Sequence, residues 1–377
     1  MLRTRAEAGD AILQGRGLGL LVAILLASCG SEKSHPLAAS DPSDAPTADT
    51  SATPGPPGGT DSLGPTDSLN TPDSLNADSL GNDPLPPPGP PRTYSGLPFG
   101  PAHLWTLSRL NWGPSPFTAS QVYTEADSLI LQINAARDQG QRLVVAMAGG
   151  ESTDYTTEGE FDLTTWKNTM DTYNTPVIQA AVAAAVADGT LIGNVLIDEP
   201  ETKQWGTHMT KALVDQMGAY VKTIFPTLPV GVNHGPPGYQ WQATERYNVV
   251  DFVRYQYNWY ITEGDVGAWR DAVLAQAKRD GVTPALSINV LNGGVKDKEG
   301  DWLCVDEGQA GVGTYWPNCR MTPDQVKSWG TALAPYGCFF FMWQYDDNYI
   351  SNPANQEAFQ AVADLAASLP ARSCRRA

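Results

Sequence analysis

Several features are scarce in this chain of 377 residues, and each scarcity excludes a class of function. Histidine occurs four times, one of them in a low-complexity segment, which disfavours a metal-dependent hydrolase built on clustered His and Asp ligands. Lys and Arg number 24 against 41 Asp and Glu, and the net charge of −17 argues against a nucleic-acid partner. No Gly-x-Gly-x-x-Gly turn or phosphate loop follows a predicted strand, so we expect no nucleotide cofactor.

A membrane-spanning apolar run is also lacking at the N-terminus. Residues 18–27 are apolar except for Gly19, and this run is too short to span a bilayer. It follows a basic beginning (Arg3, Arg5) and ends in Leu26-Ala27-Ser28-Cys29. This ending resembles the lipobox of bacterial lipoproteins, whose Cys becomes the lipidated N-terminus after cleavage. A plain secretory signal with an incidental Cys is the alternative.

The lipobox resemblance implies a location and an anchor. Residues 1–28 would be a signal peptide, and acyl chains on Cys29 would hold the protein on a membrane without spanning it. Gly30 argues against retention in the inner membrane. We therefore expect a lipid-anchored protein of the bacterial cell envelope, on the outer membrane, facing either the periplasm or the outside.

Residues 29–93 contain little that could form a core. They are rich in Pro, Ser and Asp, and Asp-Ser-Leu recurs at Asp61, Asp67, Asp73 and Asp78. Because there is almost nothing apolar to bury, we predict a disordered tether that holds the following domain away from the membrane. The repeats could bind calcium, but they lack the Gly-Asp spacing of known calcium repeats.

Residues 94–377 alternate between strand-like and helix-like segments, which predicts an α/β domain with a parallel sheet. The expected strands are Leu97–Trp105, Arg142–Gly150, one within the stretch Leu191–Glu201, Pro229–His234, Val249–Tyr257, Ala285–Leu291 and Gly337–Tyr345. The expected helices are Ser120–Gln139, Leu163–Asp188, Met209–Phe225, Asp265–Asp280 and Asn355–Leu369. Seven strands are one short of a (β/α)8 TIM-type barrel, and the stretch 238–247 shows no convincing helix.

Polar and aromatic residues follow almost every predicted strand. This favours a barrel, possibly irregular in construction, over an open doubly wound sheet, which gathers such residues at one switch point. Four cysteines other than Cys29 suggest two disulfides in an oxidising compartment. Of three possible pairings we favour Cys304 with Cys319 and Cys338 with Cys374. No Cys-x-x-Cys spacing is present, so a zinc site is disfavoured and no metal is expected.

The candidate catalytic group lies in the stretch Val195-Leu196-Ile197-Asp198-Glu199-Pro200. The three apolar residues are typical of a strand buried on both faces, and Pro200 ends its hydrogen bonding. Two carboxylates therefore stand at the carboxyl end of a strand, where α/β barrels place their chemistry. The alternative is that Asp198 caps the next segment and Glu199 is a solvated loop residue.

The residues after the other predicted strands are acids, amides and aromatics, with few basic residues. Together they would line the opening at the carboxyl end of the barrel, here called the mouth. Aromatic faces stack on sugar rings, and carboxylates and amides bind hydroxyls, so the expected substrate is a carbohydrate. Beside Glu199, Asp198 and Asp346 as catalytic candidates, the expected substrate-binding residues are His103, Trp105, Asn233, His234, Tyr257, Trp259, Asn292, Trp343, Gln344 and Tyr345.

The stretch ending in Asp198-Glu199-Pro200 is similar to the Asn-Glu-Pro strand of the clan A glycosidases, whose Glu is the general acid/base. Here Asp198 replaces the Asn. An adjacent Asp-Glu pair also resembles the barrel hexosaminidases, in which the Asp orients the 2-acetamido group and the Glu protonates the leaving oxygen. Met342-Trp343-Gln344-Tyr345 resembles the last barrel strand of several glycosidases, including muramidases. The resemblance implies a TIM-barrel glycoside hydrolase with Glu199 as general acid.

The clan A pattern would place a nucleophilic Glu at the end of the seventh strand, where this chain has none and only Asp346 and Asp347 stand nearby. Three mechanisms stay open: Glu199 with Asp346, the Asp198–Glu199 pair with substrate assistance, or an inverting pair set further apart. A glycan-binding lipoprotein on a barrel scaffold without catalysis is the second functional hypothesis. In either case we expect a monomer.

Overall fold

The structure is a computed structural model that describes residues 94–104, 115–148, 152–259, 265–294, 320–343 and 345–376. The predicted signal peptide, Cys29 and tether lie outside these ranges, as do Trp105, Gln344 and the predicted pair Cys304 and Cys319. None of the helices in the described ranges is long and apolar enough to cross a membrane.

Eight parallel strands form one sheet in the order β1-β10-β9-β8-β7-β6-β3-β2. They are β1 (Phe99–Pro101), β2 (Ala119–Tyr123), β3 (Arg142–Ala146), β6 (Leu191–Asp198), β7 (Val230–His234), β8 (Phe252–Tyr257), β9 (Thr283–Asn289) and β10 (Phe340–Trp343). Phe99 C=O accepts a hydrogen bond from Thr118 N–H (2.8 Å), and Leu104 pairs with Val122. Because these contacts join β1 to β2, the sheet closes, and the predicted (β/α)8 barrel is confirmed.

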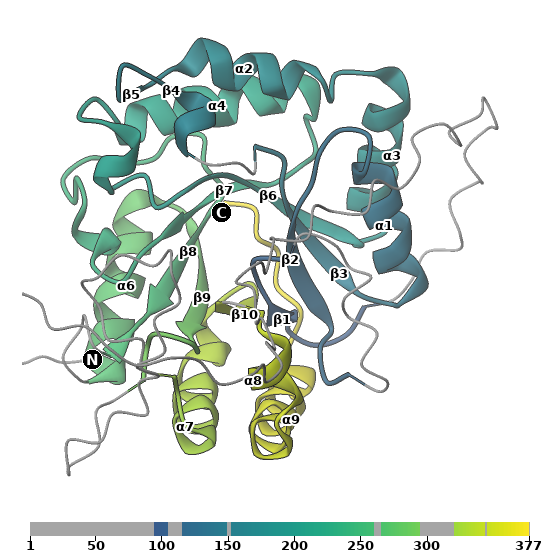
Figure 1. Ribbon diagram of the computed structural model, residues 1–377, viewed down its shortest axis with the longest axis vertical. Coiled ribbons are helices and arrows are strands. Elements are labelled where there is room, and N and C mark those ends of the chain that lie inside the picture. Colours follow the sequence, from purple (N-terminus) through teal and green to yellow (C-terminus); the bar gives the residue numbers. More distant parts are fainter. Residues whose placement is uncertain are drawn as a thin grey trace, which may run out of the picture. The chain divides into compact units, whose positions relative to one another are not determined.

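Helices surround the strands (Figure 1). They are α1 (Leu129–Asp138), α2 (Leu163–Asp171), α3 (Pro176–Ala187), α4 (Lys211–Ile224), α6 (Val266–Asp280), α7 (Pro323–Leu333), α8 (Asp347–Ser351) and α9 (Pro353–Ser368). Short 3₁₀ turns are η3 (Ser152–Tyr155), η4 (Lys203–Trp205), η5 (Gly238–Gln240) and η6 (Ala334–Tyr336), and β4 (Thr156–Thr157) and β5 (Glu160–Phe161) form a hairpin after β3.

Three sequence-based assignments were wrong in detail. The predicted helix Ser120–Gln139 contains strand β2 and the shorter α1, because Val122, Leu129 and Ile133 fit a helical spacing by chance. The predicted helix Leu163–Asp188 is divided into α2 and α3, since Thr175 caps a new helix that has Pro176 in its first turn. Helix α7 was not predicted, although Thr322 and Gln325 form a capping box at its start.

The barrel is irregular between β7 and β8, where only η5 stands in place of a helix. Side chains of neighbouring helices hold this segment. Lys211 Nζ of α4 lies 2.9 Å from Asp280 Oδ1 of α6 and 3.2 Å from Glu245 C=O, with both charged side chains 2% exposed. Asp215 accepts hydrogen bonds from the N–H groups of residues 248–250. These contacts replace the packing that a helix would supply.

Small and apolar residues fill the interior of the barrel toward the amino ends of its strands. Phe252 of β8 points inward, and a Cβ on Gly193 or Gly231 would lie 2.7 or 2.3 Å from its ring. β7, which is paired with β8, and β6, the next strand in the sheet, therefore carry glycine where the Phe252 ring needs room. Arg254 and Gln256 follow Phe252 on the same inward face, so the barrel becomes polar toward its carboxyl end.

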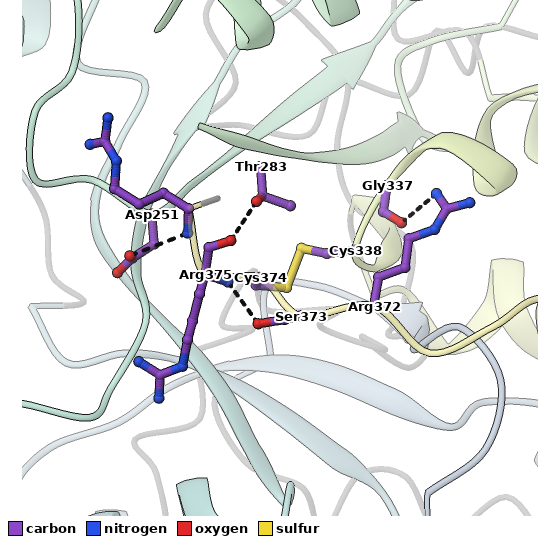
Figure 2. Close-up of a disulfide and its surroundings, with 9 residues drawn as sticks. Asp251, Thr283, Gly337, Cys338, Arg372, Ser373, Cys374 and Arg375 are labelled. Atoms are coloured by element: carbon purple, nitrogen blue, oxygen red, sulfur yellow. Dashed lines mark hydrogen bonds between the residues drawn. A yellow bond between two sulfur atoms is a disulfide. The ribbon is translucent and has the colours of Figure 1, made fainter. Parts of the chain in front are cut away.

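The segment after α9 crosses the amino end of the barrel (Figure 2). Cys374 forms a disulfide with Cys338, just before β10, which confirms this predicted pairing. Arg375 C=O accepts a hydrogen bond from the Thr283 hydroxyl at the start of β9 (2.6 Å), and Arg376 Nη1 donates to Val250 C=O (3.2 Å). The chain end thus fastens the end of the barrel that lies opposite the predicted mouth.

Candidate active site

The Asp198-Glu199-Pro200 turn ends β6, the fourth strand of the barrel in sequence. Asp198 pairs with Asn233 of β7, and the Glu199 N–H donates to Asn233 C=O (2.9 Å), so the neighbouring strand fixes the turn. Glu199 has a φ of 45°, in the left-handed region that side chains other than Gly seldom adopt. Such strain is held where the surrounding structure over-determines the backbone, and it gathers at functional sites.

Asp198 points into the upper barrel and is held by two strands. Its Oδ1 accepts a hydrogen bond from Asn233 Nδ2 (2.8 Å) and lies 3.9 Å from Arg254 Nη2. Its backbone carbonyl accepts from Trp205 Nε1 (2.7 Å). The Asp198 side chain is 40% exposed against 3% for Arg254, so a carboxylate faces the mouth over a buried cation.

Glu199 is half-buried beside these charges. Burial, followed by the negative charges of Asp198 and Glu201, raises the pKa of Glu199 to about 8, while Arg254 works in the opposite direction. A carboxyl group with this pKa is protonated at neutral pH and can donate its proton. The general acid expected from the sequence therefore has the protonation state that role needs.

Glu201 belongs to the same cluster, although it is not among the site residues expected from the sequence. Its Oε2 lies 2.7 Å from His234 Nδ1, and its Oε1 accepts from Gly235 N–H (2.7 Å). The predicted site residue His234 is 2% exposed and contacts Glu201 and Tyr247. An acid two residues beyond Glu199, with a His at the next strand end, is a signal that could have identified Glu201.

Aromatic side chains stand across the mouth. His103, after β1, has a φ of 63°, and its Nδ1 lies 3.1 Å from Tyr123 Oη at the end of β2. Its ring meets Trp343 of β10 edge-on, with centroids 6.1 Å apart. Around the closed barrel β10 and β1 lie three or four places from β6 and β7, so Trp343 and His103 stand across from the acids. Tyr123 on β2 is two places from β6 and stands between the two groups.

The expectation that Tyr257 lies in the mouth was wrong. Its ring packs between Trp269 of α6 and Trp329 of α7, each 5.2 Å away, in the layer between strand and helices. Side chains alternate along a strand, and Arg254 faces inward, so Tyr255 and Tyr257 must face outward. Tyr257 therefore does not contribute to the burial of Glu199.

The remaining candidates lie at strand ends with structural contacts. Asp346 caps α8 by accepting from Tyr349 N–H (2.7 Å), which gives this proposed second carboxylate a structural role. Tyr345 is 8% exposed and its hydroxyl bonds to Asp347. The Asn292 C=O accepts from the Asn258 side chain (3.0 Å), and Trp259 N–H donates to Gly293 C=O (3.2 Å), so the loops after β8 and β9 are tied together.

The seventh strand is β9, whereas the sequence predicts the strand before Asp346 as the seventh. It ends in Ser287-Ile288-Asn289. The described part of β9 and its turn, up to Gly294, therefore carries no carboxylate in the position of a clan A nucleophile. No group of three His, Cys, Asp or Glu side chains that could hold a metal occurs among the residues that the structure covers.

No protein-family model and no curated protein sequence matches this chain. Among solved structures it is similar to xylanase 10B from Thermotoga maritima (9% identity, 72% of this chain and 96% of that chain, TM-score 0.43). It is also similar to a GH113 β-1,4-mannanase (11% identity, 72% of this chain and 99% of that chain, TM-score 0.46). A third similar structure is the GH113 β-mannanase from Alicyclobacillus acidocaldarius (13% identity, 72% of this chain and 98% of that chain, TM-score 0.43). These are glycoside hydrolases, the group that the sequence resembles. With TM-scores below 0.5, the fold assignment rests on the strand order and any function rests on the site.

Proposed function

We propose that the protein is a glycoside hydrolase of the cell envelope that acts on a poly- or oligosaccharide, with Glu199 as its general acid. The observation that carries the proposal is the Asp198-Glu199-Pro200 turn. It sets a carboxyl group with a pKa of about 8 at the carboxyl end of the fourth barrel strand. Cleavage of a glycosidic bond needs a proton on the leaving oxygen, and a group that stays protonated at pH 7 supplies it.

Asp198 is the partner that the described geometry favours for Glu199. The Asn233 amide and the buried Arg254 guanidinium hold one of its oxygens, which leaves the exposed part of the carboxylate toward the mouth. Asp346, by contrast, is engaged as a helix cap. We therefore favour the mechanism in which Asp198 orients a neighbouring group of the substrate while Glu199 protonates the leaving oxygen.

The aromatic side chains at the ends of β10, β1 and β2 support a carbohydrate as the substrate. Trp343, His103 and Tyr123 present ring edges and faces, which suit a sugar ring better than a charged or phosphorylated group.

The decisive experiment is a panel of polysaccharides and glycopeptides incubated with the full chain, with the products analysed by mass spectrometry. Glu199→Gln serves as the inactive control and the exposed Glu245→Gln as the matched control. We expect defined oligosaccharides from wild type and Glu245→Gln, and none from Glu199→Gln. Equal product from all three proteins would show that the activity is a contaminant or that the acid lies elsewhere.

The second candidate function is glycan binding without catalysis. It is favoured by the lack of a carboxylate at the described end of β9, where a retaining clan A enzyme would have its nucleophile. The same panel discriminates between the two functions. Saturable binding of a glycan by wild type, with the glycan recovered intact after long incubation, would support binding alone.

A further inference from the structure

Glu201 is directed away from the mouth and has both of its oxygens engaged. Oε1 accepts from Gly235 N–H and Oε2 faces His234 Nδ1, each at 2.7 Å, and the side chain is 10% exposed. A carboxylate bound in this way is fixed in place and has little room to attack a substrate. Its effect on the reaction must therefore come through its charge.

His234 completes the chain of contacts behind Glu201. Its Nε2 lies 3.1 Å from Tyr247 Oη, and burial raises the pKa of Tyr247 well above its ordinary value, so this hydroxyl keeps its proton. The tautomer with its proton on Nδ1 satisfies both contacts. Nδ1–H donates to Glu201, and Nε2 accepts from the Tyr247 hydroxyl. The ring of His234 thus links the Glu201 carboxyl group to Tyr247 and fixes its orientation.

Glu199 and Glu201 border the same small space. A Cβ placed on Gly235 would lie 2.9 Å from Glu199 Oε1 and 3.3 Å from Glu201 Oε1. The turn thus brings two carboxyl groups together over a glycine that has no side chain to separate them. A negative charge on one carboxyl group bordering this space opposes ionisation of the other.

Three charged groups act on Glu199 from the elements around it: Asp198 of β6, Glu201 of the same turn and Arg254 of β8. Asp198 has the larger effect of the two acids and lies 3.9 Å from the Arg254 guanidinium, whose charge works in the opposite direction. The contacts of Glu201, by contrast, are a backbone N–H, which is neutral, and the ring of His234. Glu201 therefore leaves a negative charge that opposes ionisation of Glu199.

We propose that Glu201 is a positioning residue that keeps the acid loaded: His234 and Gly235 hold it as a carboxylate, and its charge retains the proton on Glu199 until a substrate takes it. The role of Glu201 in catalysis rests on the proposed function, because it presupposes that Glu199 is the general acid. Its physical content, a proton held on one carboxyl by another, is measurable without any substrate.

The test is a carboxyl titration of the full chain labelled with ¹³C at the Glu side-chain carboxyl carbons and observed by NMR. The signal that Glu199→Gln removes identifies Glu199. In wild type its midpoint is expected near pH 8. Glu201→Gln should lower that midpoint by roughly one pH unit or more, since a like charge has been removed. Glu245→Gln removes an exposed charge from the segment between β7 and β8 and should leave the midpoint unchanged.

The outcomes separate the two ideas. If wild type hydrolyses glycans but Glu201→Gln leaves the Glu199 midpoint in place, the inference is overturned and the function stands. If the midpoint falls but no glycan is cleaved, the inference holds and the function fails. If Glu201→Gln does not fold, the titration of wild type alone tests the inference. Two coupled titration steps, one for Glu199 and one for Glu201, would support it. A Glu199 midpoint at the ordinary value of about 4.3 would overturn it.

Discussion

Glu199 combines two unfavourable features, a left-handed backbone and a carboxyl group beside other acids. The φ of 45° costs roughly 1–2 kcal/mol for a residue with a side chain. The raised pKa of Glu199 also lowers the free energy of unfolding as pH rises, because burial and the charges of Asp198 and Glu201 oppose ionisation in the folded state. A residue that served only as a solvated loop acid would avoid both costs.

The raised pKa predicts a specific pH dependence of stability. Between pH 4.5 and about 8 the folded carboxyl holds a proton that the unfolded chain has released, so stability falls as pH rises through this window. Glu199→Gln abolishes this dependence. The free energy of unfolding of wild type, relative to Glu199→Gln, should fall by up to about 1.4 kcal/mol per pH unit between pH 5 and 8. Urea denaturation of both proteins at several pH values measures it, and parallel curves would refute the raised pKa.

The sequence predicts which residues lie at the end of a strand, but it predicts their place in the site only where the inward face of the strand can be recognised. The Asp198-Glu199-Pro200 turn was found because an apolar run stops at a Pro. Tyr257 was misplaced because the inward face of β8 is set by Arg254, a charged residue that the sequence pattern does not mark as interior. Glu201 was passed over because its significance depends on His234 and Gly235, which are more than thirty residues away.

At the scale of elements, the barrel tolerates a missing helix between β7 and β8. The strands and most helices followed from periodicity, whereas β2 and α7 did not. Strand β2 has only five residues, and its apolar positions continue into α1 at helical spacing. The ion pair of Lys211 with Asp280, which holds the irregular segment, could not be read from sequence because its members are 69 positions apart.

This buried pair predicts a large loss of stability when one partner is removed. Lys211→Met leaves the Asp280 carboxylate, 2% exposed, without its cation. The expected cost is about 3–5 kcal/mol in the free energy of unfolding. Lys278→Met, an exposed change on α6, should cost less than about 0.5 kcal/mol. If chemical denaturation gives the two variants equal stability, the segment is held by something other than this pair.

At the scale of the whole molecule, the chain end is fastened to the amino end of the barrel. The Cys338–Cys374 disulfide closes a loop with a sequence separation of 36. Loop-closure entropy predicts a stabilisation of about 3–4 kcal/mol for a loop of this length. Cys374→Ser should show this loss in urea denaturation, and wild type treated with reductant should match the variant. A variant as stable as the oxidised protein would exclude the disulfide as a stabilising element.

The anchor is a second prediction at this scale, and it concerns residues outside the described ranges. If the ending Leu26-Ala27-Ser28-Cys29 is a lipobox, Cys29→Ala should abolish acylation and move the protein from the membrane fraction to the soluble fraction. Metabolic labelling with a fatty acid, followed by fractionation, measures both. Unchanged labelling and fractionation would rule out the lipoprotein hypothesis while leaving the barrel and its site untouched.

The central claim, that Glu199 protonates the leaving oxygen, is tested most directly by comparing leaving groups. Glu199→Gln keeps the shape of the side chain and removes the proton. For natural glycans it should lower kcat/KM by roughly 10²–10⁴, and for aryl glycosides with activated leaving groups, which need little protonation, by far less. Steady-state kinetics of wild type and Glu199→Gln on both kinds of substrate give this ratio. A loss of the same size for both, or no loss for natural glycans, would contradict the account.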